Sequence, residues 1–283
     1  MKSYIKFIGK DKMYKVQEEI NVEMVNLTPT MRCNLKCKLC GVLVPHYSYC
    51  PQMAKDEFIN SLKAVFEIID HVNKLQITGG EPFIHPQLAE LVEACFEYKK
   101  QFGKLWIFTN GTVPLSAKML DILKRYNSDI LIHISDYGLR REITTKLIED
   151  IEKTGCQYRY LKYYGEQQYF DGWVDQGDFI SHNRNEKDME EVFEHCPHVC
   201  RGGSWYVRNG QMHWCGRSIR GFELEKIPLK EGEYLNIYEG NIEERRDKFK
   251  NLMKLKSITA CNYCNGNYGT NQEDKRYPAG QQM

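Results

Sequence analysis

The sequence predicts an α/β fold built around a parallel β-sheet. From residue 22 to residue 162, apolar runs of about five residues alternate with amphipathic helical patterns, as in repeated βα units. Turn or polar residues follow four of the apolar runs, and the carboxyl ends of parallel strands share one edge of a sheet. We therefore expect the active site along that edge, in a barrel, a partial barrel or a doubly wound sheet.

The elements follow one another in a regular order. Apolar positions that recur at helical spacing indicate helices, and short apolar runs indicate strands. The expected strands are 22–27, 74–78, 104–109, 129–135 and 156–162, and the expected helices are 55–71, 86–101, 115–126 and 141–154. The stretch 163–195 lacks periodicity and leaves room for a sixth strand.

The βα alternation stops at about residue 190. Beyond it, WYVR and QMHW flank Asn209-Gly210, which predicts a β-hairpin, and a helical pattern covers 242–257. We divide the chain into an N-terminal extension (1–21), a βα domain (22–190), a small α+β module (191–268) and a polar tail (269–283). The composition of the tail is typical of disordered segments.

Composition argues against several classes of protein. The 283 residues carry a formal net charge of +1, which gives no electrostatic reason to expect nucleic acid or an anionic membrane as a partner. The first residues lack the apolar core of a signal peptide, and no apolar run approaches the roughly 18 residues of a membrane span. We expect a cytoplasmic protein that binds neither a membrane nor nucleic acid.

Eleven cysteines indicate metal or redox chemistry. An odd number of cysteines in a chain without a secretion signal argues against a disulfide scaffold. Cys33, Cys37 and Cys40 have the spacing C-x3-C-x2-C directly after the first strand. Structural zinc takes four protein ligands, whereas an iron–sulfur cubane held by three thiolates keeps one iron open for a small ligand. Either a distant fourth ligand completes this group, or the site is open.

These cysteines, together with GGEP (79–82) after the second strand, closely resemble the radical S-adenosylmethionine (SAM) superfamily. The resemblance implies a partial (β/α)6 TIM-like barrel with a small C-terminal α+β iron–sulfur module. It also implies that Cys33, Cys37 and Cys40 hold a [4Fe–4S] cluster whose open iron binds SAM. An electron from a flavodoxin- or ferredoxin-type donor then cleaves SAM to methionine and a 5′-deoxyadenosyl radical, which abstracts hydrogen from the substrate.

The resemblance assigns further residues to SAM. Gly79 and Gly80 lack a Cβ atom, so their backbone carbonyls can approach the methionine amino group. Arg159 would pair with the SAM carboxylate, with an exposed surface position as the alternative. Leu39 stands where the family usually has an aromatic residue, and an apolar side chain still covers the adenine. The expected SAM contacts are Leu39, Gly79, Gly80, Glu81, Pro82, Asn110 (alternatively a turn residue), Ser135 and Asp136 at the ribose, and Arg159.

A second thiol group lies in the small module. Cys200, Gly210 and Cys215 are spaced C-x9-G-x4-C, and Cys261 and Cys264 form C-x2-C. This order resembles the twitch module, a shortened SPASM domain, and implies one auxiliary [4Fe–4S] cluster held by Cys200, Cys215, Cys261 and Cys264. A zinc ion bound by four cysteines is the alternative.

Two other cysteines are candidates to donate a hydrogen atom to a substrate radical. Cys196 lies four residues before Cys200 and is left free, because CRGG at 200–203 matches the opening of the twitch module. A small buried side chain or an alternative cluster ligand are the other interpretations of Cys196. Cys156, at the start of the fifth strand, is a weaker candidate for the same role.

The segment 158–179 interleaves eight aromatic residues with Asp171, Asp175 and Asp178. Aromatic faces beside carboxylates suit a polyhydroxylated or aminated ligand, and packing between the two domains is the alternative. Only 21 residues precede the first strand, so we expect no leader-peptide recognition domain, which favours a small molecule.

We therefore predict a radical SAM enzyme, of oxidoreductase or epimerase type, that abstracts hydrogen from a small polar metabolite resembling a carbohydrate or an aminocyclitol. The expected outcome is dehydrogenation through the auxiliary cluster or epimerisation by a thiol. A peptide- or protein-modifying maturase or epimerase of the same superfamily is the alternative. A non-catalytic cysteine–metal protein is a more distant one.

Overall fold

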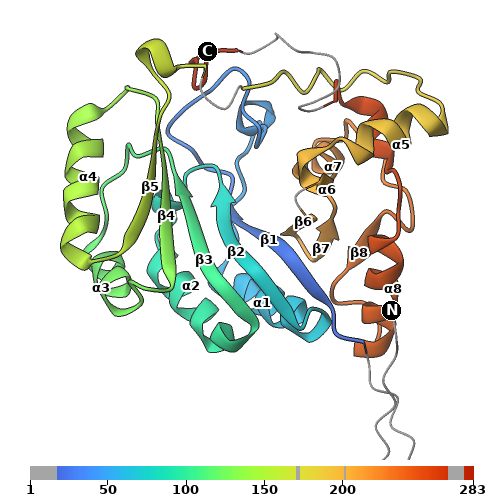
Figure 1. Cartoon of the computed structure of the whole chain (residues 1–283), viewed down its shortest axis with the longest axis horizontal. Helices are drawn as coiled ribbons and strands as arrows, with labels where there is room; N and C mark the ends of the chain where they lie inside the picture. Colours follow the sequence, from blue (N-terminus) through green and yellow to red (C-terminus); the bar gives the residue numbers. More distant parts are fainter. Residues whose placement is uncertain (1–17, 170–172, 201, 267–276) are drawn as a thin grey trace, which may run out of the picture.

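The structure is a computed structural model that describes residues 18–169, 173–200, 202–266 and 277–283. Eight strands join into one sheet with the order β5-β4-β3-β2-β1-β6-β7-β8 (Figure 1). The strands are β1 (Asn21–Thr30), β2 (His71–Gly79), β3 (Phe102–Thr109), β4 (Ile130–Asp136), β5 (Gln157–Lys162), β6 (Ser204–Arg208), β7 (Gln211–His213) and β8 (Tyr234–Asn236).

Most of this sheet is parallel. Strands β1 to β5 pair in parallel in chain order, and β6 pairs in parallel with the other side of β1. Strands β7 and β8 then continue the sheet in antiparallel orientation. The sheet is open, because β5 and β8 are its two edges. The predicted α/β fold with a parallel sheet is confirmed.

Helices α1 to α4 cover the outer side of strands β1 to β5 (Figure 1). Phe58, Leu62 and Val65 of α1 are fully buried, which is the spacing of an amphipathic helix. None of the helices in the described ranges is long and apolar enough to cross a membrane. The helices are α1 (Lys55–Ile68), α2 (Leu88–Cys95), α3 (Ala117–Arg125), α4 (Arg141–Thr154), α5 (Glu186–Glu194), α6 (Pro197–Cys200), α7 (Gly216–Glu223) and α8 (Ile242–Met253).

The two faces of the sheet differ in polarity. On the helix-covered face, Leu105 and Ile107 of β3 belong to the main apolar core. On the opposite, inner face, Asn26 of β1 pairs in register with Gln76 of β2 and with Tyr206 of β6. Because side chains alternate between the faces of a strand, this register gathers polar groups on the inner face, where the site described below lies.

The prediction of a sixth strand within 163–195 is wrong for the described residues of that stretch, which form turns and helix. Strand β6 takes the place beside β1 instead. The predicted hairpin is confirmed, since Asn209 and Gly210 have φ of 49° and 73°, as a two-residue type I′ turn requires. Trp205 and Val207 of β6 are each 1% exposed, so burial of these side chains favours the pairing of β6 with β1.

Two helical patterns end differently from the prediction. The pattern 86–101 divides into α2 and a 3₁₀ segment, Phe96–Gln101, with non-helical backbone at Tyr98 (φ −105°, ψ 20°). The side-chain amide of Gln101 donates to the carbonyl of Phe66 at 3.0 Å, which fixes the end of this segment against α1. Helix α1 itself stops at Ile68, because β2 begins three residues later.

Residues 277–283 of the predicted polar tail pack on the three-cysteine loop, so the expectation of disorder is wrong for them. The backbone N–H of Lys38 donates to the carbonyl of Gln281 at 2.8 Å, and that of Met283 donates to Lys36 at 2.9 Å. Composition fails here because backbone pairing requires no apolar side chains. Residues 269–276 of the tail and residues 1–17 of the N-terminal extension lie outside the described residues.

Candidate active site

The three-cysteine loop leaves the carboxyl end of β1. Cys37 is buried, and Cys33 and Cys40 are half-buried. Burial is the main cause that raises the pKa of Cys33 to about 12 and that of Cys37 to about 11, and neighbouring thiols add to both shifts. Thiolates at these positions therefore need a bound metal centre to be stable, as metal-ligating cysteines do.

Three thiols are the donor type that binds an iron–sulfur cluster. Within the described part of the chain, no three cysteine, histidine or carboxylate side chains converge closely enough to hold one metal ion. A zinc site needs its sulfurs about 2.3 Å from a single centre, whereas the thiolates of a cubane bind different irons and stand farther apart. Neighbouring thiols add to the pKa shifts of Cys33 and Cys37, so the three cysteines lie close enough to bind one metal centre.

The glycines of GGEP bring β2 against this loop. A Cβ atom at Gly80 would lie 2.1 Å from the carbonyl oxygen of Arg32, and one at Gly79 would lie 2.3 Å from that of Thr30. The backbone N–H of Gly80 donates to Thr30 at 2.9 Å, and that of Glu81 donates to Arg32 at 2.8 Å. Both glycines are therefore required by the close approach of β2 to the backbone that precedes Cys33.

Glu81 is fully buried, and both oxygens of its carboxylate accept hydrogen bonds from protein groups. It accepts hydrogen bonds from the backbone N–H of Phe83 (3.0 Å) and Asn110 (2.7 Å) and from the hydroxyl of Thr109 (2.9 Å). Burial raises the pKa of Glu81 to about 7. The side-chain amide of Asn110 lies 3.8 Å from the Cys33 sulfur. Glu81 thus ties the ends of β2 and β3 together and positions Asn110 beside a predicted cluster ligand.

The other expected SAM contacts lie in different environments. Asp136 accepts hydrogen bonds from the backbone N–H of Gly138 (2.8 Å) and the hydroxyl of Tyr160 (2.7 Å), so both carboxylate oxygens have protein partners. Ser135 hydrogen-bonds the hydroxyl of Tyr137, whose pKa is raised by burial and by the nearby Cys37. Ser135 and Asp136 therefore share the edge of the sheet that carries the three-cysteine loop.

Three further expected SAM contacts, Leu39, Pro82 and Arg159, lie in a loop, a turn and a strand. Leu39 is half-buried between two of the cysteines, and Pro82 is buried at the start of the 3₁₀ turn Pro82–Ile84. Arg159 lies opposite His133 in the register of β4 and β5, with an exposed side chain. The exposed position of Arg159 agrees with the surface alternative stated for it.

The sequence carries no indication of one side chain that contacts a predicted cluster ligand. The Nε2 atom of Gln282 donates to the sulfur of Cys37 at 3.3 Å, and its Oε1 atom accepts from the backbone N–H of Lys36 at 2.8 Å. Gly280 (φ 64°) supports this segment, because a Cβ atom there would lie 2.4 Å from the ring of Tyr137. Nothing in the local sequence signals a contact between residues 245 positions apart.

The second thiol group contains Cys196 and not Cys200. Cys196, Cys215, Cys261 and Cys264 line one cavity. Burial raises the pKa of Cys196, Cys215 and Cys261, and neighbouring thiols of the group add to each of these three shifts. Cys200 is exposed and donates to the carbonyl of Glu194 at 2.7 Å. The single turn of α6 separates the two thiols, so the structure does not bring Cys200 into the group.

Cys156 lies away from both thiol groups. It precedes β5 and its sulfur lies 3.6 Å from the carbonyl of Ile130, the first residue of β4. These are the amino ends of the strands, and the three-cysteine loop is at the carboxyl ends. The structure therefore does not place Cys156 where a substrate radical would form.

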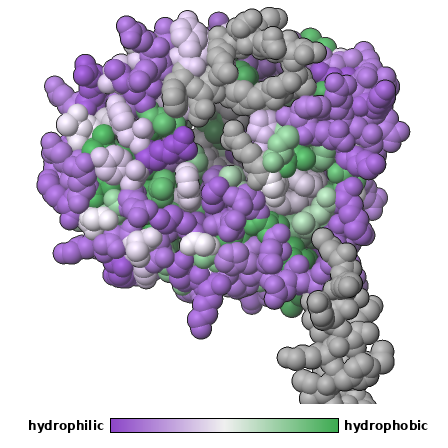
Figure 2. Space-filling view, in the orientation of Figure 1, coloured by the Kyte–Doolittle hydropathy of each residue, from purple (hydrophilic) through white to green (hydrophobic). Residues whose placement is uncertain are grey.

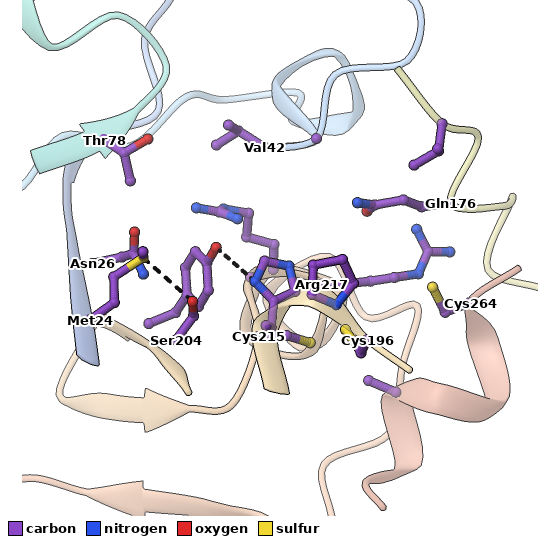
Figure 3. A pocket seen from close by; sticks show the side chains of 18 of the residues that line it. Met24, Asn26, Val42, Thr78, Gln176, Cys196, Ser204, Cys215, Arg217 and Cys264 are labelled. Carbon is purple, nitrogen blue, oxygen red and sulfur yellow. Dashed lines mark hydrogen bonds between the residues drawn. The ribbon is translucent and has the colours of Figure 1, made fainter. Parts of the chain in front are cut away.

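A cavity of about 420 Å³ lies between the second thiol group and the residues that directly follow Cys40. It begins at Gly41 and Val42, directly after Cys40, and reaches the four thiols of the second group. Figure 3 shows Asn26 and Thr78 of the sheet on one side, and Cys196, Cys215 and Cys264 on the other. Figure 2 shows a hollow on this face of the molecule, with apolar residues around it and hydrophilic residues at the periphery. The volume of the cavity is in the range of pockets that bind small ligands.

The acidic and aromatic segment contributes less than expected. Asp175 and Asp178 accept hydrogen bonds from the backbone N–H groups of Gly177 (2.9 Å) and Ile180 (3.1 Å), and neither lines the cavity. Asp171 lies outside the described residues. The expected meeting of carboxylates with a substrate is therefore not seen in the described part of this segment.

Comparisons with known proteins add to this picture. Residues 27–163 match the model of the radical SAM superfamily. The chain is 32% identical over 117 residues to the antilisterial bacteriocin subtilosin biosynthesis protein AlbA of Bacillus subtilis (strain 168), over 40% of this chain and 24% of AlbA. It is 28% identical over 141 residues to GTP 3′,8-cyclase of Aliarcobacter butzleri (strain RM4018), over 47% of this chain and 42% of the cyclase. The matches thus span less than half the length of either relative.

A solved structure shares the fold over a longer part of the chain. BtrN in complex with AdoMet and 2-DOIA has a TM-score of 0.55 at 18% identity, over 92% of this chain and 98% of that chain. The match of residues 27–163 and the arrangement of the three-cysteine loop agree with the resemblance stated from the motifs. Residues 27–163 therefore form a radical SAM domain, and this superfamily of enzymes implies a [4Fe–4S] cluster and SAM.

Proposed function

We propose that the protein cleaves SAM reductively and abstracts hydrogen from a small polar metabolite held in the cavity between the two thiol groups. The observation that carries this proposal is the cavity itself, which extends from Gly41 and Val42 beside the three-cysteine loop to Cys196, Cys215 and Cys264. When bound, the cluster and SAM supply the 5′-deoxyadenosyl radical, and the protein supplies position and shielding.

The chain's own residues would prepare the first site in three ways. Cys33, Cys37 and Cys40 would hold the cluster. Asn110 and Gln282 would direct N–H groups at the sulfurs of Cys33 and Cys37, and such hydrogen bonds stabilise a negatively charged cluster. The predicted contacts of GGEP, Ser135 and Asp136 with SAM stay a proposal, supported by their position on the same edge of the sheet.

We assign the auxiliary [4Fe–4S] cluster of a twitch-type module to Cys196, Cys215, Cys261 and Cys264, with Cys196 in place of Cys200. Four thiols at one cavity support this assignment, because four thiolates are the usual ligands of a closed cubane. With Cys196 as a ligand and Cys156 at the opposite edge, neither thiol remains to donate a hydrogen atom. The proposed outcome is therefore oxidation of the substrate through the auxiliary cluster, in preference to epimerisation.

Modification of a peptide is the second candidate function. The name of AlbA places that relative in the biosynthesis of a bacteriocin, but it is matched over only 24% of its length. The cavity of about 420 Å³ is in the range of pockets that surround small ligands, which supports the small-molecule proposal. The hypothesis of a non-catalytic metal protein finds no support, since the matched superfamily consists of enzymes. A flavodoxin- or ferredoxin-type electron donor is proposed from the same membership.

The test of the function is formation of 5′-deoxyadenosine. Anaerobically reconstituted protein with SAM and dithionite should produce it, and Cys33→Ala should reduce the yield to background. Cys50→Ala is the matched control, since Cys50 follows the same loop without an assigned role, and it should keep the activity. A Cys33→Ala protein that forms 5′-deoxyadenosine at the wild-type rate would overturn the proposal. Deuterium transfer from labelled candidates into 5′-deoxyadenosine then identifies the substrate.

A further inference from the structure

The cavity contains two buried arginines and no carboxylate. Arg217 and Arg220 stand one turn apart on α7, are 5% and 3% exposed, and line the cavity. Among the described residues, no aspartate or glutamate lines the cavity, and none forms an ion pair with either arginine. A buried charge without a counter-charge is costly, so each arginine needs an explanation.

Arg217 is explained by the second thiol group. Its Nε and Nη2 atoms donate to the carbonyl of Tyr263 at 3.0 and 2.7 Å, and Nη2 also donates to Gly177 at 3.1 Å. Burial lowers its pKa, and the thiols of Cys264 and Cys215 oppose that shift. Its positive charge therefore lies where thiolates of the auxiliary cluster would carry negative charge.

Arg220 has no comparable partner. Its Nη2 atom donates to the hydroxyl of Thr28 at a long 3.4 Å, and its Nε atom has no hydrogen-bond acceptor among the described residues. The guanidinium carbon lies 5.4 Å from the ring centre of Tyr206. Glu223 on the same helix is bound instead by Arg208, Nε to Oε1 at 2.7 Å. The nearest carboxylate on α7 is thus already neutralised.

The backbone is shaped to keep Arg220 in this position. A Cβ atom at Gly216 would lie 2.1 Å from the Nη1 atom of Arg220, so the glycine leaves space for the guanidinium against the first turn of α7. Gln76 and Thr78 also line the cavity with polar side chains. The cavity therefore contains, at Arg220, a cation without an ion-pair partner among the described residues, and polar side chains that can form neutral hydrogen bonds.

We propose that Arg220 binds an anionic group of the substrate, a carboxylate or a phosphate, while Gln76 and Thr78 contact its neutral polar part. A guanidinium is suited to both anions, because it forms paired, charge-assisted hydrogen bonds. An aminated substrate would bring a second cation into a cavity without a carboxylate. The inference deepens the proposed function, on which it rests for taking the cavity as the substrate site, and replaces an aminocyclitol-like substrate by an acidic one.

The first experiment measures anion binding to the reconstituted protein by calorimetry, with inorganic phosphate and with acetate as probes. We expect wild-type protein to bind at least one of them, and Arg220→Gln to bind it at least about tenfold more weakly. Arg220→Lys keeps the positive charge but lacks the paired donors, so its affinity for the anion should lie between those of the wild type and Arg220→Gln. Arg125→Gln removes an exposed arginine of α3 without an assigned role and is the matched control, which should bind the anion as the wild type does. The probe that binds more tightly indicates whether the anionic group of the substrate is a phosphate or a carboxylate.

A second measurement uses only the wild-type protein, so its result does not depend on whether a variant folds. Phenylglyoxal modifies accessible arginines, and mass spectrometry locates the product. Phosphate or acetate should protect Arg220 in the wild-type protein, and the exposed Arg125 should react equally in both conditions. Wild-type protein that binds neither anion, or Arg220→Gln that binds it with wild-type affinity, overturns the proposal. Formation of 5′-deoxyadenosine is assayed in the same samples, so anion binding without SAM cleavage would refute only the proposed function.

Discussion

Cys196 and Cys200 are four residues apart, and the structure gives them different surroundings. Cys196 lines the cavity with three other thiols, and Cys200 is exposed. Cys196→Ala should therefore lower the iron content of the reconstituted protein from about eight to about four atoms per chain, because one of two cubanes loses a ligand. Cys200→Ala should leave about eight. Iron and sulfide analysis measures this content. The reverse result would assign Cys200, and not Cys196, as the ligand.

Gln282 provides a second prediction for a single residue. Its amide donates to the Cys37 sulfur at 3.3 Å, and a hydrogen bond to a cluster sulfur favours the more negative, reduced state. Gln282→Ala should lower the midpoint potential of the SAM-binding cluster by an amount on the order of tens of millivolts. The measurement is a redox titration followed by electron paramagnetic resonance, with SAM added to identify the signal of this cluster.

The control for this prediction is the preceding residue. Gln281 contributes only its backbone carbonyl to Lys38, so Gln281→Ala should keep the wild-type potential. Equal potentials for Gln282→Ala and Gln281→Ala would show that the contact with Cys37 has no effect on the cluster.

The predictability of the site from sequence differs from residue to residue. The first three cysteines are close to one another in sequence, and they and GGEP each follow a strand, so the order of strands indicates that they meet at one edge of the sheet. Spacing could not distinguish Cys196 from Cys200, because the direction of each thiol depends on how α6 turns after Pro197. Gln282 and Arg220 depend on packing between distant parts of the chain, of which the local sequence carries no sign.

At the scale of elements, the segment 277–283 depends on one glycine. Gly280→Ala should displace this segment, because the new Cβ would lie 2.4 Å from the ring of Tyr137. Gly165→Ala is a matched control, since Gly165 has the same φ of 64° and a Cβ atom there would have no other atom within 4 Å. Both changes carry the strain of a positive φ, about 1–2 kcal/mol, and only the first adds a clash.

Hydrogen exchange of the apo protein separates the two variants. The backbone amides of Lys38 and Met283 form hydrogen bonds that join the three-cysteine loop to segment 277–283. In Gly280→Ala these two amide hydrogens should exchange at least about tenfold faster than in the wild-type protein. In Gly165→Ala they should keep wild-type rates. Unchanged exchange in Gly280→Ala would mean that the segment does not depend on this glycine.

The elements themselves were predictable wherever their signal is local. Strands β1 to β5 and helices α1 to α4 follow from apolar periodicity within each stretch, and α4 (Arg141–Thr154) coincides with its predicted range. Strand β6 was recognisable as half of a hairpin. Its place beside β1 was not, because Met24 pairs with Ser204 across 180 residues of chain, and such a pairing is decided by burial of Trp205 and Val207.

At the scale of the whole molecule, β6 makes the two predicted domains parts of one sheet. A fragment of residues 18–190 would leave the edge of β1 unpaired, beside Val25 and Leu27, which are 0% and 1% exposed in the intact chain. Exposed apolar strand edges associate with one another. The fragment should therefore aggregate, while the full chain stays in solution under the same conditions. Size-exclusion chromatography measures this, and a monomeric fragment with a cooperative thermal transition would show that 22–190 folds independently.

The contact between Gln282 and Cys37 also has a consequence for the time course of synthesis. The two residues are 245 positions apart, and a ribosome adds about 5–20 residues per second, so Gln282 follows Cys37 by roughly 12–50 s. During that interval the backbone N–H of Lys38 lacks its acceptor and the loop is uncovered. Delivery of iron and sulfide to the first three cysteines can therefore precede the arrival of the segment that covers them, and later exchange of the cluster requires that this segment moves away.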